Sequence, residues 1–266
     1  MQGPGTHRLT RTWGRVKRLS DRTRERVRGL PLRALYRRRR LPIPPGRLMH
    51  LVAGTEDVSW FLDSGAVAAN HIAEILARNG RPVESMADVL DFGCGAGRVM
   101  RHWRDLQGPA FHGANYNSDL VAWCRSNLPF AQFQVNGLGR GLASGDGSFD
   151  LIYALSVFTH LSEPLQRFWV DELSRVLRPG GFLLITTHGD FYRNRLTEAE
   201  QTTFRAGRMV VRGETRDGSN DCAVFHPEAY VRSTLAARLD VVDFLPEGAA
   251  GNPRQDVVLL RKPGAA

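Results

Sequence analysis

Cysteine is scarce in this 266-residue sequence, and long apolar runs are missing from it. The three cysteines, Cys94, Cys124 and Cys222, are far apart and form no CxxC pair, which argues against a disulfide framework and against a zinc site. No run of about 18 apolar residues offers a transmembrane helix, and the first residues lack the apolar core of a secretory signal. These absences predict a soluble protein in a reducing, cytoplasmic setting.

Acidic residues are almost missing from the first 50 positions. Residues 1–50 hold 15 lysines and arginines against two acids, Asp21 and Glu25, which gives a net charge of +13. In residues 51–266, 21 basic residues against 25 acids give −4. Four prolines between residues 31 and 45 interrupt any long helix. We expect a basic, flexible or partly helical N-terminal arm. It either stays in solvent, contacts an anionic membrane surface or nucleic acid, or is an organelle transit peptide.

Strand-like and helix-like patterns alternate after these prolines. Apolar residues recur at helical intervals in residues 64–78. Short apolar runs typical of buried strands follow: ADVLDF, AFHGANY, AQFQV, DLIYALSVF and GFLLITTH. Helical patterns stand between them in RVMRHWRDL, SDLVAWCRSNL and PLQRFWVDELSRVL. Such alternation predicts an α/β domain over residues 51–266, with a doubly wound, mostly parallel sheet and helices on both faces.

Two more strand patterns close the domain. Residues 238–248 and 254–262 are joined by a loop rich in proline and glycine, and they predict a C-terminal antiparallel edge hairpin. In a doubly wound sheet, ligands bind in the crevice at the carboxyl ends of the strands. We therefore expect the site residues to come from five short stretches, residues 91–97, 115–117, 136–137, 156–160 and 188–190.

A glycine-rich turn follows the first predicted strand, in the sequence VLDFGCGAGRVM at residues 89–100. Its glycines, Gly93, Gly95 and Gly97, stand at alternate positions, whereas a dinucleotide fingerprint would read GxGxxG and a phosphate-binding loop would end in GK[ST]. The spacing therefore predicts a nucleotide-binding site that does not bind a phosphate group. The structural alternative is a strand-to-helix turn in which glycine only permits positive φ.

The sequence resembles class I S-adenosylmethionine (SAM)-dependent methyltransferases over roughly residues 60–190. The residues that carry the resemblance are VLDFGCGAGR, HGANYNSDLVAWCRSNLPFAQFQVNG, DGSFDLIYALSVFTHL and ELSRVLRPGGFLLITTHGD. The resemblance implies a Rossmann-like fold and SAM as the cofactor. It also implies a set of cofactor-binding residues, namely Asp91, Gly93, Cys94, Gly95, Gly97, Asn115, Tyr116, Asn136, Gly137 and Ser156.

Within that family each strand end has its own part of the cofactor. The resemblance implies that the glycine turn lies against the methionine moiety, that Asn136 and Gly137 meet the adenine amino group, and that Ser156 faces the cofactor from the other side. The residue at the second strand end usually binds the ribose and is usually an acid, but this sequence has Asn115 there. An amide offers one acceptor and no charge, so we expect weaker ribose binding or help from Tyr116.

Two histidines are our candidates for catalysis. Methyl transfer needs alignment of donor and acceptor and in some cases removal of a proton. His160 follows the fourth strand and His188 ends the fifth, and either imidazole could be a general base because it titrates near neutral pH. The alternatives are a structural role for His160, capping the turn before residue 163, and catalysis by alignment alone. No metal-ligand set is recognisable.

The sequence contains few signals that indicate which molecule accepts the methyl group. Residues 190–226 are where this fold commonly inserts a substrate cap, and several arginines there suit an anionic or sugar-like acceptor or a solvated face. No (D/N)PP(Y/F) motif follows the fourth strand, which argues against methylation of nucleobase amino groups. We predict a methyltransferase with a small-molecule acceptor, through O-methylation of a glycan or secondary metabolite.

Two other functions remain open. One is an RNA methyltransferase that uses the basic arm for phosphate contacts, although the charge of −4 on residues 51–266 argues against it. The other is a non-catalytic SAM-binding protein. A cytoplasmic location with peripheral contact to anionic membranes through the arm is compatible with each of these functions.

The Asn115 prediction can be tested by substitution. If Asn115 occupies the ribose position, Asn115→Asp should bind SAM about tenfold more tightly, because a carboxylate accepts hydrogen bonds from both ribose hydroxyls. Titration calorimetry with SAM measures the change. Weaker binding by the aspartate variant would show that the second strand is aligned wrongly.

Overall fold

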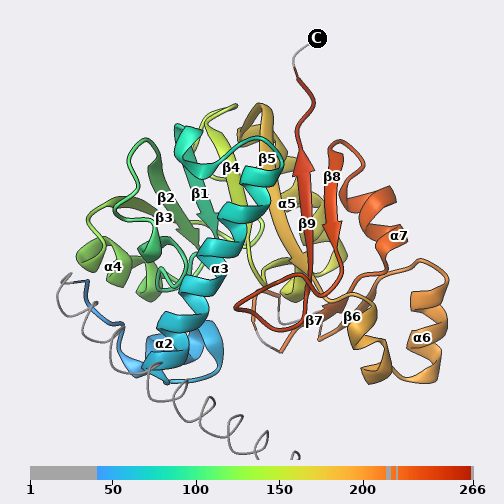
Figure 1. The fold of residues 1–266 in the computed structure, drawn as a ribbon. Coiled ribbons are helices and arrows are strands. Elements are labelled where there is room, and N and C mark those ends of the chain that lie inside the picture. The colour runs from blue at the N-terminus through green and yellow to red at the C-terminus, as the bar shows by residue number, and fades with distance from the viewer. Residues whose placement is uncertain (1–40, 214–216, 220, 265–266) are drawn as a thin grey trace, which may run out of the picture. The chain divides into compact units, whose positions relative to one another are not determined.

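The computed structural model describes residues 41–213, 217–219 and 221–264. The chain divides into two units, residues 1–42 and residues 43–266, and the account below concerns the second (Figure 1). Predictions for the arm at residues 1–40 fall outside the described residues. The second unit begins before residue 51, the expected start of the domain, because Leu48 and Met49 are only 1% and 2% exposed.

A mixed sheet forms the centre of this unit. In the described part of the chain seven strands pair in the order β3-β2-β1-β4-β5-β9-β8. The strands are β1 (Asp88–Phe92), β2 (Ala110–Asn115), β3 (Ala131–Val135), β4 (Phe149–Ala154), β5 (Leu177–Thr187), β8 (Asp240–Leu245) and β9 (Asp256–Arg261). The first five are parallel, whereas β9 runs antiparallel between β5 and β8. The predicted Rossmann-like α/β fold with its C-terminal antiparallel hairpin is confirmed.

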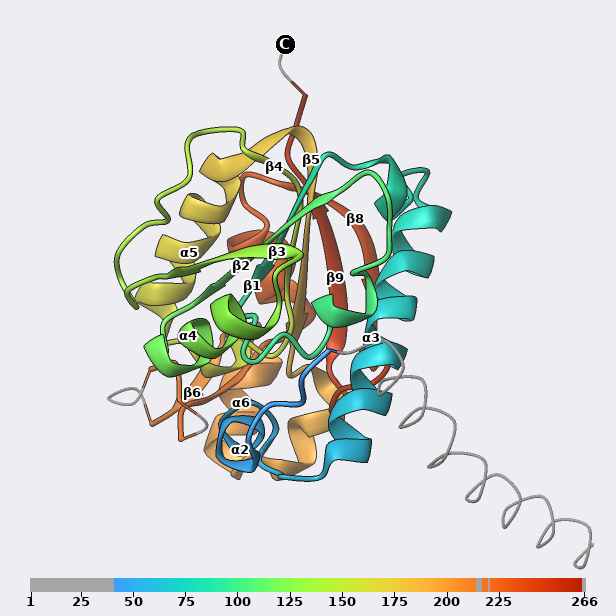
Figure 2. The same ribbon diagram turned by 90° about the vertical axis from the view of Figure 1, so that its left-hand side faces the viewer.

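Helices cover both faces of the sheet. The longest is α3 (Val58–Arg78), which begins where the Asp57 carboxylate accepts hydrogen bonds from the backbone N–H groups of Ser59 and Trp60. Figure 2 shows α3 and α5 (Glu163–Val176) on opposite faces. Helix α4 (Ser118–Asn127) is capped by Asn117 in the same way as α3 is by Asp57. None of the described helices is both long and apolar enough to cross a bilayer.

One predicted helix is absent from the described chain. Residues 98–106 form turns and a short 3₁₀ segment, Met100–His102, in place of an α-helix. An amphipathic surface helix keeps its charged side chains in solvent. Here the four consecutive residues 98–101 are all buried, including Arg98 at 8% and Arg101 at 1% exposure, so the segment has no solvent-facing side of that kind.

An insertion lies at the end of the sheet where the parallel strands finish. It contains the 3₁₀ segment Asp190–Arg195, α6 (Glu198–Arg205), and the antiparallel pair β6 (Val210–Arg212) and β7 (Ala223–Phe225). A small apolar cluster of its own holds it together, made of Tyr192, Leu196, Phe204, Val210 and Phe225. Figure 1 shows this insertion at the same end of the sheet as α2 (Gly46–Ala53), so the carboxyl edge is covered from two sides.

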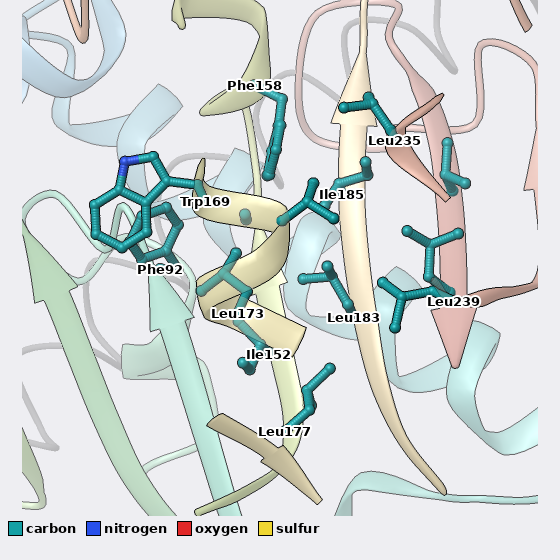
Figure 3. Packing of buried hydrophobic residues seen from close by; sticks show 14 of the residues in the cluster. Phe92, Ile152, Phe158, Trp169, Leu173, Leu177, Leu183, Ile185, Leu235 and Leu239 are labelled. Atoms are coloured by element: carbon teal, nitrogen blue, oxygen red, sulfur yellow. The ribbon is translucent and has the colours of Figure 1, made fainter. Parts of the chain in front are cut away.

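The main apolar core lies between the sheet and α5. Phe92 and Trp169 meet there with ring centroids 4.5 Å apart (Figure 3). The indole N–H of Trp169 donates a hydrogen bond of 2.7 Å to the carbonyl of Leu138. Leu183 and Ile185 of β5 are fully buried in the same cluster. Because β5 is flanked by β4 and β9, its apolar residues support the strands on both sides.

We expect Leu183→Ala to lower the free energy of unfolding by about 3 kcal/mol, since it leaves a cavity in a closely packed core. Urea denaturation measures the change. Val67→Ala on α3 is the control, because Val67 is 48% exposed and should change stability by less than about 0.5 kcal/mol. Equal effects of the two substitutions would contradict this description of the core.

Candidate active site

A cavity of about 440 Å³ lies at the carboxyl ends of the parallel strands. Ten of the predicted site residues line it: Asp91, Gly93, Cys94, Gly95, Asn115, Tyr116, Asn136, Ser156, His160 and His188. Gly97 and Gly137 are not among the lining residues. The structure therefore brings together residues from five strand ends that are separated by up to 97 positions in the sequence.

The glycine turn requires glycine at each of its three positions. Gly93, Gly95 and Gly97 have φ angles of +83°, +53° and +68°, which side chains rarely adopt. A Cβ atom at Gly97 would stand 2.4 Å from Leu128 Cδ1, so this glycine serves the packing of the turn. A Cβ atom at Gly95 would stand 2.7 Å from Val52 Cγ2. Helix α2 therefore lies directly over the centre of the turn.

A buried acid and a buried arginine flank the turn. Burial raises the pKa of Asp91 to about 7, although the nearby Tyr153 hydroxyl and Arg98 guanidinium oppose the rise. Arg98 Nη1 donates hydrogen bonds of 3.1 Å to Ser64 Oγ and 3.2 Å to the carbonyl of Gly251. Its Nη2 donates to Asn252 Oδ1 at 2.5 Å. Arg98 therefore ties the turn to α3 and to the loop before β9.

The amides at the ends of β2 and β3 have different partners. Asn115 Oδ1 accepts a hydrogen bond of 2.9 Å from the N–H of Asn117, which fixes its side chain at the start of α4. Asn136 Nδ2 donates to the carbonyl of Gly137 at 3.1 Å, while its buried Oδ1 atom has no partner among the described residues. A buried acceptor of this kind is costly unless a ligand completes it. Tyr116 is 44% exposed at the mouth of the cavity.

Each of the two histidines is fixed by a backbone carbonyl of the insertion. His160 Nδ1 lies 2.6 Å from the carbonyl oxygen of Cys222, and His188 Nδ1 lies 3.0 Å from that of Val224. Because a carbonyl only accepts, both Nδ1 atoms carry the proton, and both Nε2 atoms hold the lone pair of the neutral ring. Burial lowers the pKa of both rings, to about 4 for His188.

The structural alternative, in which His160 caps the turn before residue 163, is met only in that its ring bonds to a backbone carbonyl. The residue at the start of α5 is Ser162, and the ring of His160 bonds to Cys222, which lies 62 positions away in the insertion. His160 is therefore held by the insertion. Its ring centroid stands 6.4 Å from that of His188.

Several lining residues were missed by the sequence analysis. They include Leu51, Val52, Ala53, Gly54, Trp60, Arg98, Leu138, Trp169, Gly218, Asn252, Pro253 and Gln255. Of these, Arg98 directly follows the glycine turn and could have been included. Within the described ranges no group of three or more histidine, cysteine, aspartate or glutamate side chains could hold a metal ion.

Comparison with known proteins places residues 90–185 in a family described as methyltransferase domain. The chain is 33% identical over 106 residues to a malonyl-[acyl-carrier protein] O-methyltransferase of Enterobacter lignolyticus, which covers 40% of this chain and 41% of that protein. It is 34% identical over 100 residues to a fatty-acid O-methyltransferase of Mycolicibacterium smegmatis, covering 37% and 36% of the two chains. The matched segment thus spans about two fifths of these relatives.

Solved structures show the same fold. A putative sarcosine dimethylglycine methyltransferase from Galdieria sulphuraria superposes with a TM-score of 0.52 at 18% identity, over 73% of this chain and 85% of that one. The fold, the glycine turn and the matched family agree. Residues 90–185 therefore match a methyltransferase domain, and the whole sheet has the Rossmann-like fold of solved methyltransferases.

Proposed function

We propose that this chain transfers the methyl group of SAM to an oxygen atom of a small-molecule acceptor, of the glycan or secondary-metabolite kind. The observation that carries the proposal is the arrangement of His160. Its Nδ1–H is bound to the carbonyl of Cys222, and its ring lines the cavity that also contains the glycine turn. A neutral histidine held in this way presents an unprotonated Nε2 atom to an acceptor.

The residues of the cavity fit the cofactor. A volume of about 440 Å³ has room for a nucleoside with a short chain. The unpartnered Oδ1 of Asn136 suits the adenine amino group, Asn115 the ribose, and Asp91 with the glycine turn the methionine moiety. When bound, SAM supplies an electrophilic methyl group on its sulfonium.

His160 can take the proton that an acceptor hydroxyl loses. The O–H bond breaks as an N–H bond forms at Nε2, and the ring becomes an imidazolium. The carbonyl of Cys222, 2.6 Å from Nδ1, stabilises that positive charge and keeps the ring oriented. Burial lowers the pKa of His160, so the ring is neutral and ready to accept a proton at neutral pH.

Two further observations support a small acceptor and an oxygen nucleophile. The insertion and α2 both lie at the carboxyl edge of the sheet, and the cavity of about 440 Å³ at this edge has the size of a small-molecule site. The two relatives reported above are named as O-methyltransferases. Residues 51–266 carry a charge of −4, which disfavours an RNA acceptor.

The test of this function is transfer of label from methyl-labelled SAM. The full-length protein is incubated with separate fractions of small hydroxyl compounds, of small amines and of RNA. We expect label in the hydroxyl fraction, in a product that resists treatment removing N-methyl groups. Label in RNA would favour the alternative acceptor, and SAM bound without any transfer would favour a non-catalytic SAM-binding protein.

SAM affinity should depend on pH through Asp91. The buried carboxyl has a pKa raised to about 7, so it is neutral below that pH and negatively charged above it. SAM carries a net positive charge, and we therefore expect its affinity to fall as pH drops below 7, by up to about tenfold per unit. Calorimetry from pH 8 to pH 5.5 measures this, with Asp91→Asn as the control that should lose the dependence. Parallel pH profiles for the two proteins would contradict the assignment.

His160→Ala should lower single-turnover transfer by about two to four orders of magnitude, because a positioned base typically contributes that much. SAM affinity should stay within about twofold, since the ring is on the acceptor side. His71→Ala on α3 is the matched control and should transfer at the wild-type rate, because His71 is not among the lining residues. A rate for His160→Ala within a few-fold of wild type would leave alignment alone as the mechanism.

A further inference from the structure

Gln255 is a buried residue of the cavity that neither the fold nor the proposed function accounts for. It directly precedes β9, which pairs antiparallel with β5 so that Asp256 stands opposite Thr187. The beginning of β9 therefore lies at the same edge as the ends of the parallel strands. Gln255 is 1% exposed and lines the cavity between Ser156 and His188.

Both ends of the Gln255 amide are hydrogen-bonded. Its Oε1 accepts a bond of 2.9 Å from the hydroxyl of Ser156, and its Nε2 lies 3.3 Å from His188 Nε2. Because the Nδ1 proton of His188 is donated to the carbonyl of Val224, His188 Nε2 is an acceptor and the amide must donate to it. Both hydrogen bonds therefore require the same orientation of the amide, with Oε1 toward Ser156 and Nε2 toward His188.

The two histidines differ because of this contact. The lone pair of His188 is occupied by the Gln255 amide, whereas His160 Nε2 has no partner among the described residues. Ser156 is itself constrained, with φ at +56° and its N–H bound to Thr186 Oγ1 at 2.7 Å. A chain of hydrogen bonds thus runs from the cofactor side at Ser156 through Gln255 to His188 and the insertion.

We propose that Gln255 is a positioning residue that keeps His188 from acting as a base and leaves the proton of the acceptor to His160. This inference rests on the proposed function. Because the lone pair of His188 is occupied, His188 cannot accept a hydrogen bond from the acceptor hydroxyl. The hydroxyl is therefore not held at His188, out of reach of the methyl group. The same contact holds Ser156 against the cofactor side of the cavity.

The surroundings of His188 agree with a ring that stays neutral. The titratable groups that face it are His160, Arg195, His226 and Tyr192, whose ring centroid stands 4.4 Å away. Burial is the main cause that lowers its pKa; the bond to the Val224 carbonyl opposes this, and the charges of His160 and Arg195 add to it. The nearby carboxylate of Asp256 turns to the N–H of Glu247 at 2.9 Å. Replacement of Gln255 by an acid would therefore bring a negative charge to the ring.

The first measurement follows the histidines in the full-length protein by nitrogen NMR as a function of pH. In Gln255→Glu the carboxylate should hold a second proton on His188 and raise its pKa by about 2 units. The signals of His160 should move much less. Gln255→Met should remove the hydrogen bond to His188 without adding a charge. The pKa of His188 in this variant should lie between those of the wild type and of Gln255→Glu. Gln201→Met is the control, because Gln201 bonds to Leu196 inside the insertion, away from the cavity.

The second measurement is the pH profile of methyl transfer to the hydroxyl acceptor found in the labelling assay. We expect kcat of Gln255→Met to fall about tenfold, with KM for SAM within twofold of wild type. Gln255→Glu should add a second ionisation near neutral pH, which loss of stability alone would not produce. The Gln201→Met profile should match that of wild type.

The outcomes separate this inference from the function on which it rests. If the wild type transfers methyl groups but both Gln255 variants leave the His188 signals unchanged, the inference is overturned and the function stands. If the wild type transfers nothing to any acceptor, the proposed function falls, and the hydrogen-bond role of Gln255 is judged on the histidine signals alone. A wild-type pH profile for Gln255→Glu would also overturn the inference.

Discussion

The antiparallel pairing of β9 with β5 determines how this active site is assembled. Parallel strands bring their last residues to one edge, whereas an antiparallel neighbour brings its first residues to the same edge. In this chain the register that sets Asp256 opposite Thr187 places Gln255 beside His188. The loop before β9 also supplies Gly251 and Asn252, which hold Arg98 against the glycine turn. Residues near the C-terminus therefore support both the glycine turn and the side of the cavity that contains His188.

Burial and hydrogen bonding together determine the charges in the cavity. Desolvation keeps His160 and His188 neutral and raises the pKa of Asp91 to about 7. Carbonyls of Cys222 and Val224 then decide which nitrogen of each ring holds the proton. The insertion consequently shapes the cavity as well as covering it, because its backbone orients both histidines.

The sequence predicted the sheet well because its buried strands are continuous apolar runs with clear boundaries. Ten of its twelve candidate site residues line the cavity, since a strand end is recognisable once the strand is. The helix expected over residues 98–106 was wrong, because burial of Arg98 and Arg101 depends on contacts with distant elements that periodicity does not record.

Gln255 was missed for a different reason. The search was limited to the ends of parallel strands, and Gln255 stands at the beginning of an antiparallel one. Val52 was missed because it belongs to α2, a helix directly after the proline-rich segment, and nothing local shows that this helix folds over Gly95. The partner of His160 lies 62 positions along the chain, so its hydrogen bond depends on the path of the whole insertion.

A crystal structure of the full-length protein with S-adenosylhomocysteine tests the central claim most directly, because it shows the cofactor and the histidines together. The account predicts the ligand along the glycine turn, with its adenine amino group donating to Asn136 Oδ1 and its sulfur on the side of the cavity that His160 faces. It also predicts that the Nδ1 bond from His160 to Cys222 is retained. A ligand bound elsewhere, or a His160 ring turned away from the cavity, would contradict it.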